Sequence, residues 1–294
     1  MYDQANQLRQ LVKQRVVERV PKSGTRPAMI VVTSGKGGVG ATTLCANLAE
    51  QLPQAGAKTL LIDADPNGGD TSALCGLDEG RTLADVLAGR RALADVVQEG
   101  PGSLRIVPGV LGLERLSDYD LRAWDQLFSQ TAALEDVDAV LFDVGTAPNR
   151  STKRLWPAAD MAIVVVTPDT SSILDTYSAI KAHTHDGAHT AIRVVVNRAT
   201  GPETGRDVHE RLAHACQRFL GIDLHWIGQL SEDPMVTAAG RAGDLFSVAV
   251  AGCDAAKQLV KLAQAFATTI QDLRQSRAHG LATAPKLRLP QLVG

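Results

Sequence analysis

The chain has 294 residues, of which 45% are hydrophobic, 21% are charged and 4% are aromatic, and its formal net charge is −2. This composition allows one large α/β domain with a sizeable core, whereas the near-neutral charge and the few aromatic rings argue against a nucleic-acid-binding platform. The four cysteines are widely spaced, no run of about 18 apolar residues occurs and no signal peptide opens the chain, so we expect a cytoplasmic protein with reduced thiols.

The first predicted element is an amphipathic helix within residues 1–20. Apolar residues recur there every three or four positions, which places them on one helix face: Ala5, Leu8, Val12 and Val16. Asp3 can cap the start of this helix, and Pro21 ends it. Residues 21–27 are polar, with a glycine and a second proline, and predict a linker.

From residue 28 onward, apolar β-type runs alternate with amphipathic stretches of helical period. The predicted strands are 29–33, 59–62, 104–107, 139–142, 162–167, 193–196 and 224–227. The predicted helices are 42–52, 119–134, 171–182, 207–220 and 254–273. Such alternation predicts an α/β fold over residues 28–274, with a doubly wound, mainly parallel sheet and helices on both faces. Residues 275–294 are basic and irregular and predict a flexible tail.

A glycine-rich segment directly follows the first predicted strand. Residues 34–43 read SGKGGVGATT, and a strand, a glycine-rich turn and a helix start form a phosphate-binding arrangement. Against the phosphate-loop pattern G-x-x-x-x-G-K-[ST], Ala41 occupies the lysine position and a lysine stands early in the loop instead. We therefore predict a nucleotide site in which hydrolysis is weak. The residues expected to bind the nucleotide are Gly35, Lys36, Gly37, Gly38, Val39, Gly40, Ala41, Thr42 and Thr43.

Acidic and polar residues close several of the following strands. Asp63 and Asp65 come after the second strand with period-two spacing, which suits an acid near a metal and an acid that orients water. Asp143 ends the apolar run from residue 139, the Walker B arrangement that holds Mg²⁺. Asn197 and Arg198 close a later strand, where a base or ribose is within reach. Because no N-K-x-D guanine-reading motif occurs, we expect adenine.

Taken together, these motifs resemble the deviant Walker A proteins of the MinD/ParA class, whose early lysine reaches across a nucleotide-sandwich dimer. The similarity continues through residues 63–65, 82–89, 99–102, 167–170, 175–181, 195–198 and 219–223. That combination is similar to the flagellar-number regulators FlhG (also called FleN or YlxH), to about residue 270. The opening residues also match the family's DQAxxLR activator motif, at Asp3, Gln4, Ala5, Leu8 and Arg9.

The resemblance implies a phosphate-loop NTPase of the SIMIBI (MinD-like) class that binds ATP and Mg²⁺ and dimerises with ATP. In that family pattern, Asp65 orients the attacking water, Lys36 contacts the partner's nucleotide, and Asn197 faces adenine. Metal ligation is assigned to Thr42, Asp63 and Asp143. The activator helix would stimulate the signal-recognition-type GTPase FlhF, with Gln4 acting in that enzyme's active site. Flagellar number and placement would be controlled in this way, from the cytoplasm or by peripheral contact with the inner face of the plasma membrane.

Three alternatives remain open. The GVGATT end of the loop also resembles the pilus-localisation proteins CpaE and TadZ, which act as ATPases or scaffolds. A ParA-type partitioning ATPase would need a basic surface, and the balanced charge does not predict one. A nucleotide-binding pseudoenzyme would be consistent with Ala41 in place of the loop lysine. Gene neighbourhood would separate a flagellar role from a pilus role.

Overall fold

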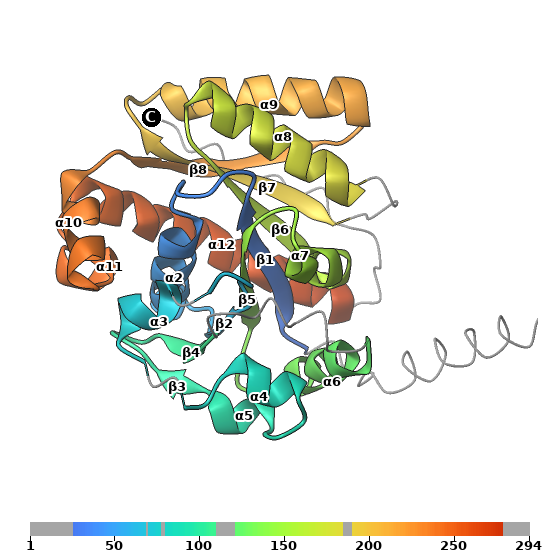
Figure 1. Ribbon diagram of the computed structural model, residues 1–294. Helices are drawn as coiled ribbons and strands as arrows, with labels where there is room; N and C mark the ends of the chain where they lie inside the picture. The colour runs from blue at the N-terminus through green and yellow to red at the C-terminus, as the bar shows by residue number, and fades with distance from the viewer. Residues whose placement is uncertain (1–25, 69, 78–79, 110–120, 185–189, 279–294) are drawn as a thin grey trace, which may run out of the picture.

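The computed structural model describes residues 26–68, 70–77, 80–109, 121–184 and 190–278, which fold around a single sheet (Figure 1). The sheet has eight strands in the order β3-β4-β2-β5-β1-β6-β7-β8. Neighbouring strands pair in parallel, except for β3 with β4, which are antiparallel. The strands are β1 (Ala28–Ser34), β2 (Thr59–Asp63), β3 (Gln98–Glu99), β4 (Arg105–Val107), β5 (Ala139–Thr146), β6 (Met161–Val166), β7 (Ala191–Ala199) and β8 (Leu224–Ser231). The predicted mainly parallel, doubly wound sheet is confirmed.

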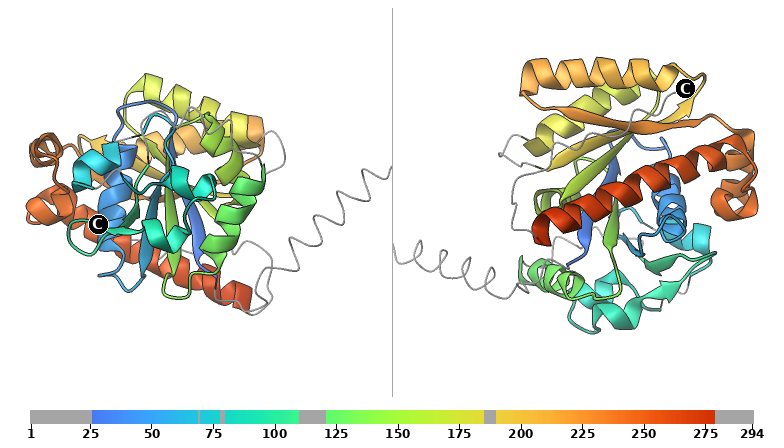
Figure 2. Two further views of the ribbon diagram at one scale, coloured as in Figure 1. Left: turned by 60° about the horizontal axis from the view of Figure 1, so that its bottom comes forward. Right: turned by 180° about the vertical axis from the view of Figure 1, so that it is seen from behind.

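Helices cover both faces of this sheet. The residues of α2 and α12 pack on one face, and Figure 2 shows α12 crossing the back of the sheet. The residues of α4 to α9 pack on the other face. The first group comprises α2 (Ala41–Gln51), α3 (Asp70–Cys75), α10 (Pro234–Ala242), α11 (Phe246–Ala249) and α12 (Asp254–Ala278). The second comprises α4 (Leu83–Leu87), α5 (Leu93–Val96), α6 (Leu121–Ala132), α7 (Arg150–Leu155), α8 (Thr170–Thr184) and α9 (Thr204–Leu220), with a 3₁₀ turn at Trp156–Ala158.

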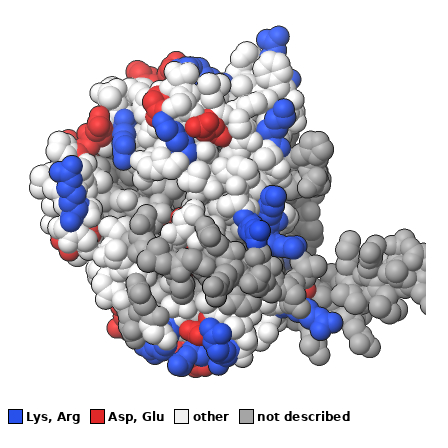
Figure 3. Space-filling model, viewed as in Figure 1, with Lys and Arg blue, Asp and Glu red and all other residues white. Residues whose placement is uncertain are grey.

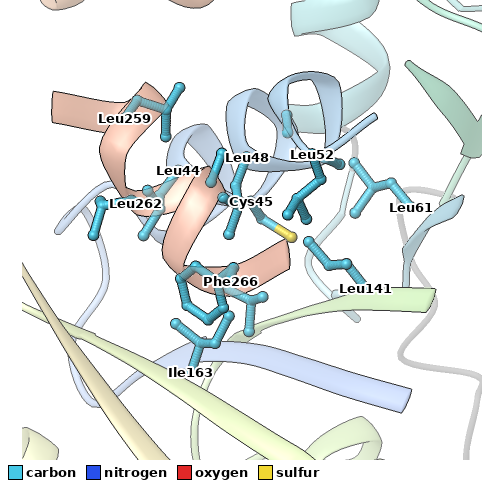
Figure 4. Packing of buried hydrophobic residues seen from close by; sticks show 14 of the residues in the cluster. Leu44, Cys45, Leu48, Leu52, Leu61, Leu141, Ile163, Leu259, Leu262 and Phe266 are labelled. Atoms are coloured by element: carbon cyan, nitrogen blue, oxygen red, sulfur yellow. The ribbon is translucent and has the colours of Figure 1, made fainter. Parts of the chain in front are cut away.

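The packing of α2 and α12 fixes the position of the glycine-rich segment. Leu44 and Leu48 of α2 lie next to Leu259, Leu262 and Phe266 of α12, and Leu52, directly after α2, belongs to the same buried cluster (Figure 4). All six side chains are buried, and burial of one such side chain stabilises the fold by about 1.5–3 kcal/mol. The start of α2 is therefore held rigidly at the carboxyl end of β1.

Several predicted boundaries need correction. Strand β5 does not end at Asp143 but continues to Thr146, because residues past Asp143 still pair with the end of β1. Helix α12 continues to Ala278, beyond the boundary predicted at 274, because its last turns carry Arg274 and Arg277, which bind the acids directly before β5 and β6. The short elements β3, α3, α4, α5, α7, α10 and α11 were not predicted, because two to nine residues give too little periodicity.

Among the described residues, no helix is both long and apolar enough to cross a membrane. The activator-motif residues Asp3, Gln4, Ala5, Leu8 and Arg9 and the predicted tail from residue 279 lie outside the described part.

Candidate functional site

The glycine-rich segment leads from the end of β1 into the first turn of α2. Gly40 precedes the helix with φ of 89°, and its carbonyl accepts a hydrogen bond from the N–H of Leu44 at 2.9 Å. Gly37 and Gly38 are exposed, and a Cβ built on Gly38 meets no atom within 4 Å. Open backbone N–H groups at a helix start attract anions. The segment thus has the shape and polarity of a phosphate-binding loop.

Two glycines of this loop are required by close contacts. A Cβ on Gly35 would lie 2.3 Å from the backbone of α8 at Asp175, and a Cβ on Gly40 would lie 2.5 Å from Nδ2 of Asn197. That Nδ2 donates a hydrogen bond to the carbonyl of Val39 at 2.8 Å. Asn197, predicted to face adenine, therefore supports the loop from the end of β7. Arg198 beside it is exposed and has φ of 55°.

The early lysine of the loop binds acceptors of its own chain. Nζ of Lys36 donates to Oδ1 of Asp169 at 3.0 Å and to Oγ of Ser171 at 2.6 Å. Hydroxyl donors of Ser171 and Thr167, together with Lys36, hold the pKa of Asp169 well below its usual range. Both charged side chains are close to half exposed, at 40% and 48%. An exposed pair of this kind is weak, so Lys36 can exchange its partners.

Two acids meet behind the loop. Asp63 and Asp143 are register partners on the adjacent strands β2 and β5, and both are 1% exposed. The side chain of Thr42 hydrogen-bonds to Asp143, and the N–H of Gly145 donates to Oδ1 of Asp143 at 3.1 Å. Burial and the nearby charge of Asp63 raise the pKa of Asp143. Oδ2 of Asp143 is buried without a hydrogen-bond partner in the described structure.

Asp65 lies against the last residues of β5, at Gly145. Gly145 has φ of 65°, and a Cβ there would lie 2.3 Å from the carboxyl carbon of Asp65, so only glycine fits. Oδ1 of Asp65 also accepts the N–H of Asn67 at 2.9 Å. Sequence reasoning missed the role of Gly145. Its signal is the glycine two residues after the strand aspartate, although nothing local indicates the contact with a residue 80 positions earlier.

A cavity of about 600 Å³ opens at the same edge of the sheet, where β7 and β8 end. Gln229 and Ser231 of β8, the loop at Gly201 and Pro202, and Gln258 of α12 contribute to its walls. Its size fits a nucleoside, and its amide groups can both donate and accept hydrogen bonds. This cavity was not predicted, because its walls come from loops far apart in the sequence.

These residues fit a nucleoside triphosphate with Mg²⁺. The loop offers N–H donors to phosphates, Thr42 offers a hydroxyl, and the acids offer oxygen ligands, which Mg²⁺ prefers. When bound, the metal would neutralise phosphate charge. Asp143, with an unpartnered buried oxygen, and Thr42 would hold it with Asp63, while Asp65 would accept a hydrogen bond from water. The structure thus brings together the predicted loop and the three predicted acids.

Comparisons with known proteins agree with this geometry. Residues 30–246 match the family model described as the CobQ/CobB/MinD/ParA nucleotide binding domain. The antiactivator FleN of Pseudomonas aeruginosa is 36% identical over 214 residues, covering 72% of this chain and 76% of FleN. The flagellum site-determining protein YlxH of Helicobacter pylori is 29% identical over 209 residues, 70% of each chain. The septum site-determining protein MinD of Pyrococcus horikoshii, solved with Mg-ADP, is 26% identical with a TM-score of 0.65, covering 81% of this chain and 94% of that one.

Proposed function

The chain belongs to the CobQ/CobB/MinD/ParA nucleotide-binding family and is close to FleN and YlxH, and on that premise we propose that it is an FlhG-type regulator that binds Mg·ATP, dimerises with it and stimulates a signal-recognition-type GTPase. One observation carries the nucleotide part of this proposal. Two buried carboxylates, Asp63 and Asp143, face each other behind a glycine-rich loop. Because like charges in a buried site repel, this pairing favours a function that brings a cation to them.

ATP-dependent dimerisation is supported by the position of Lys36. This lysine lies on an exposed loop at the phosphate site, where its ion pair with Asp169 is accessible to water. An opposing nucleotide carries more negative charge than one carboxylate. In the proposed dimer, Lys36 leaves Asp169 and binds the phosphates held by the second copy.

Stimulation of the GTPase is assigned to the activator motif at residues 3–9. Arg26, where the described chain begins, donates to Oδ1 of Asp160 at 3.2 Å, at the amino edge of the sheet. The nucleotide site lies at the opposite, carboxyl edge. The described part of the chain thus begins at the edge opposite the nucleotide site. Gln4 is assigned to orient water in the partner's active site, a role that glutamine has in other GTPases.

GTP turnover by the cognate FlhF tests this assignment. Full-length wild-type protein should accelerate it, Gln4→Ala should lose the acceleration, and the matched control Gln7→Ala, at a variable position of the same motif, should keep it. Equal acceleration by Gln4→Ala and wild type would contradict the assignment of Gln4. No acceleration by wild type would favour the pilus-localisation alternative, which the GVGATT loop supports.

A DNA-partitioning role has less support. On the described surface that Figure 3 shows, basic and acidic side chains lie side by side at the top, left and bottom, and the basic ones toward the right form small separate groups and no continuous patch. The formal net charge of −2 agrees with this view. Non-specific DNA binding relies on clustered basic side chains, and its affinity falls steeply with salt. Titration with duplex DNA at low salt checks this point: tight, salt-sensitive binding would favour partitioning instead.

A further inference from the structure

A second cavity, of about 360 Å³, lies beside the start of α2 and borders the phosphate loop at Thr42 and Thr43. Thr42 and Thr43 of α2 and Arg241 of α10 line it with polar groups. Ala73 and Leu74 of α3 form its apolar wall. Arg241 is exposed and makes no hydrogen bond or ion pair with the residues that the structure describes. A guanidinium is thus present in the same hollow as the first turn of the phosphate-loop helix.

Helix α10 is held firmly in this position. Gly243 ends the helix with φ of 76°, and a Cβ there would lie 3.3 Å from the carbonyl of Ala73. In the following helix α11, the N–H of Ser247 donates to Oδ1 of Asn47, on α2, at 2.9 Å. The end of α10 thus lies close against α3, and the next helix, α11, is bound to α2. The backbone that carries Arg241 is therefore held in place beside the loop, so little reorganisation is needed for its side chain to bind a phosphate there.

The phosphate loop has no free cation of its own for the phosphates of a bound nucleotide. Ala41 occupies the position that carries lysine in the usual phosphate loop, and it is 7% exposed. Lys36 is the sole cation of residues 34–43, and it is bound to Asp169 and Ser171. Bound phosphates would thus meet backbone donors without a side-chain cation from the loop. Guanidinium is well suited to phosphate, because its planar fork donates two parallel hydrogen bonds.

We propose that Arg241 binds the phosphates of the nucleotide held by its own chain, and that it replaces part of the charge that Ala41 does not supply. This inference rests on the proposed nucleotide site and adds a residue from α10 to it. A purely structural alternative exists, because an arginine in the last turn of a helix also interacts favourably with the helix dipole. That alternative predicts lower thermal stability without nucleotide and unchanged affinity.

The test measures two quantities for full-length variants: the Kd of a fluorescent ATP analogue with Mg²⁺, and the melting temperature without nucleotide. Arg241→Ala should weaken binding about 10- to 100-fold, the range of a lost charge-assisted hydrogen bond, and Arg241→Lys should restore part of the loss. Arg218→Ala is the matched control, since Arg218 is also an exposed residue in the last turn of a helix, α9. It should bind like wild type, and the melting temperatures of Arg241→Ala and Arg218→Ala should agree.

The same measurement in an Ala41→Lys variant tests whether Arg241 replaces the missing loop lysine. Adding Ala41→Lys should make the effect of Arg241→Ala several-fold smaller, because the loop then carries its own cation. Equal affinity of Arg241→Ala and Arg218→Ala would overturn the inference, and an equal loss in both backgrounds would overturn the replacement of Ala41. Failure of the proposed function has a different signature, namely that wild type itself binds no ATP analogue.

Discussion

At the amino edge of the sheet, Asp138 and Asp160 are matched by arginines, whereas at the carboxyl edge Asp63 and Asp143 face each other. Asp138 binds Arg274, and Asp160 binds both Arg26 and Arg277. Burial and the nearby charge of Arg26 lower the pKa of Arg277 to about 10, so Arg277 remains charged at neutral pH. Burial raises the pKa of Asp143, which has no arginine beside it in the described structure.

This difference indicates that the charged residues at the amino edge stabilise the fold, whereas those at the carboxyl edge bind a ligand. Ion pairs at the amino edge attach α12 and the beginning of the described chain to the strands. At the carboxyl edge, Oδ2 of Asp143 is buried without a hydrogen-bond partner in the described structure, which costs stability unless a ligand supplies a cation. Substitutions should therefore have opposite consequences at the two edges: loss of stability at the first, and loss of ligand binding at the second.

The largest effect is expected for Asp160→Ala. This side chain is 11% exposed, and its removal leaves Arg26 and Arg277 without their acceptor. Breaking a largely buried pair from one side destabilises by about 3 kcal/mol. Urea unfolding of the nucleotide-free protein measures this loss, and ATP affinity should stay unchanged. The exposed Asp136, which pairs with Arg105, provides the control, and Asp136→Ala should cost less than about 1 kcal/mol.

The second effect is expected for Asp143→Asn. The amide oxygen can still accept the hydrogen bonds of Thr42 and Gly145, so the fold should keep its stability or gain some as repulsion with Asp63 disappears. Loss of a carboxylate ligand should reduce ATP affinity about 10- to 100-fold in Mg²⁺ and little in EDTA. Calorimetric titration under both conditions measures this. A fall in stability as large as that of Asp160→Ala would make Asp143 a structural residue.

The smallest effect is expected for Asp169→Asn, which releases Lys36 from its own chain. Because both side chains are exposed, the pair contributes no more than about 1 kcal/mol. ATP-dependent dimerisation should therefore strengthen, by up to about five-fold. Sedimentation velocity over a range of protein concentrations measures the dimer constant. A weaker dimer would show that Asp169 acts within the dimer interface and does not compete with it.

Sequence patterns predicted one kind of feature well. The loop at residues 34–43 and the acids Asp63 and Asp143 were found because each follows a recognisable apolar strand, and parallel strands end at a common edge. The predicted end of this strand at Asp143 was wrong by three residues, since β5 continues to Thr146.

Features that depend on distant contacts were not predictable. Lys36 binds Asp169, which is 133 positions away in the sequence, and Asp160 binds arginines from both ends of the described chain. A single sequence shows such residues as ordinary surface charges. Gly145 illustrates the same limit, because a side chain at this position would collide with Asp65, which lies in the loop after β2.

The central claim is that the carboxyl edge binds Mg·ATP and that Lys36 uses it to join two copies of the chain. Light scattering after size-exclusion chromatography tests this most directly, with wild type and Lys36→Ala in ATP and in ADP. The account predicts that wild type doubles its mass in ATP and stays monomeric in ADP. Lys36→Ala should stay monomeric in both while still binding ATP. The same ATP-induced dimer in Lys36→Ala, or no dimer in wild type, would contradict the account.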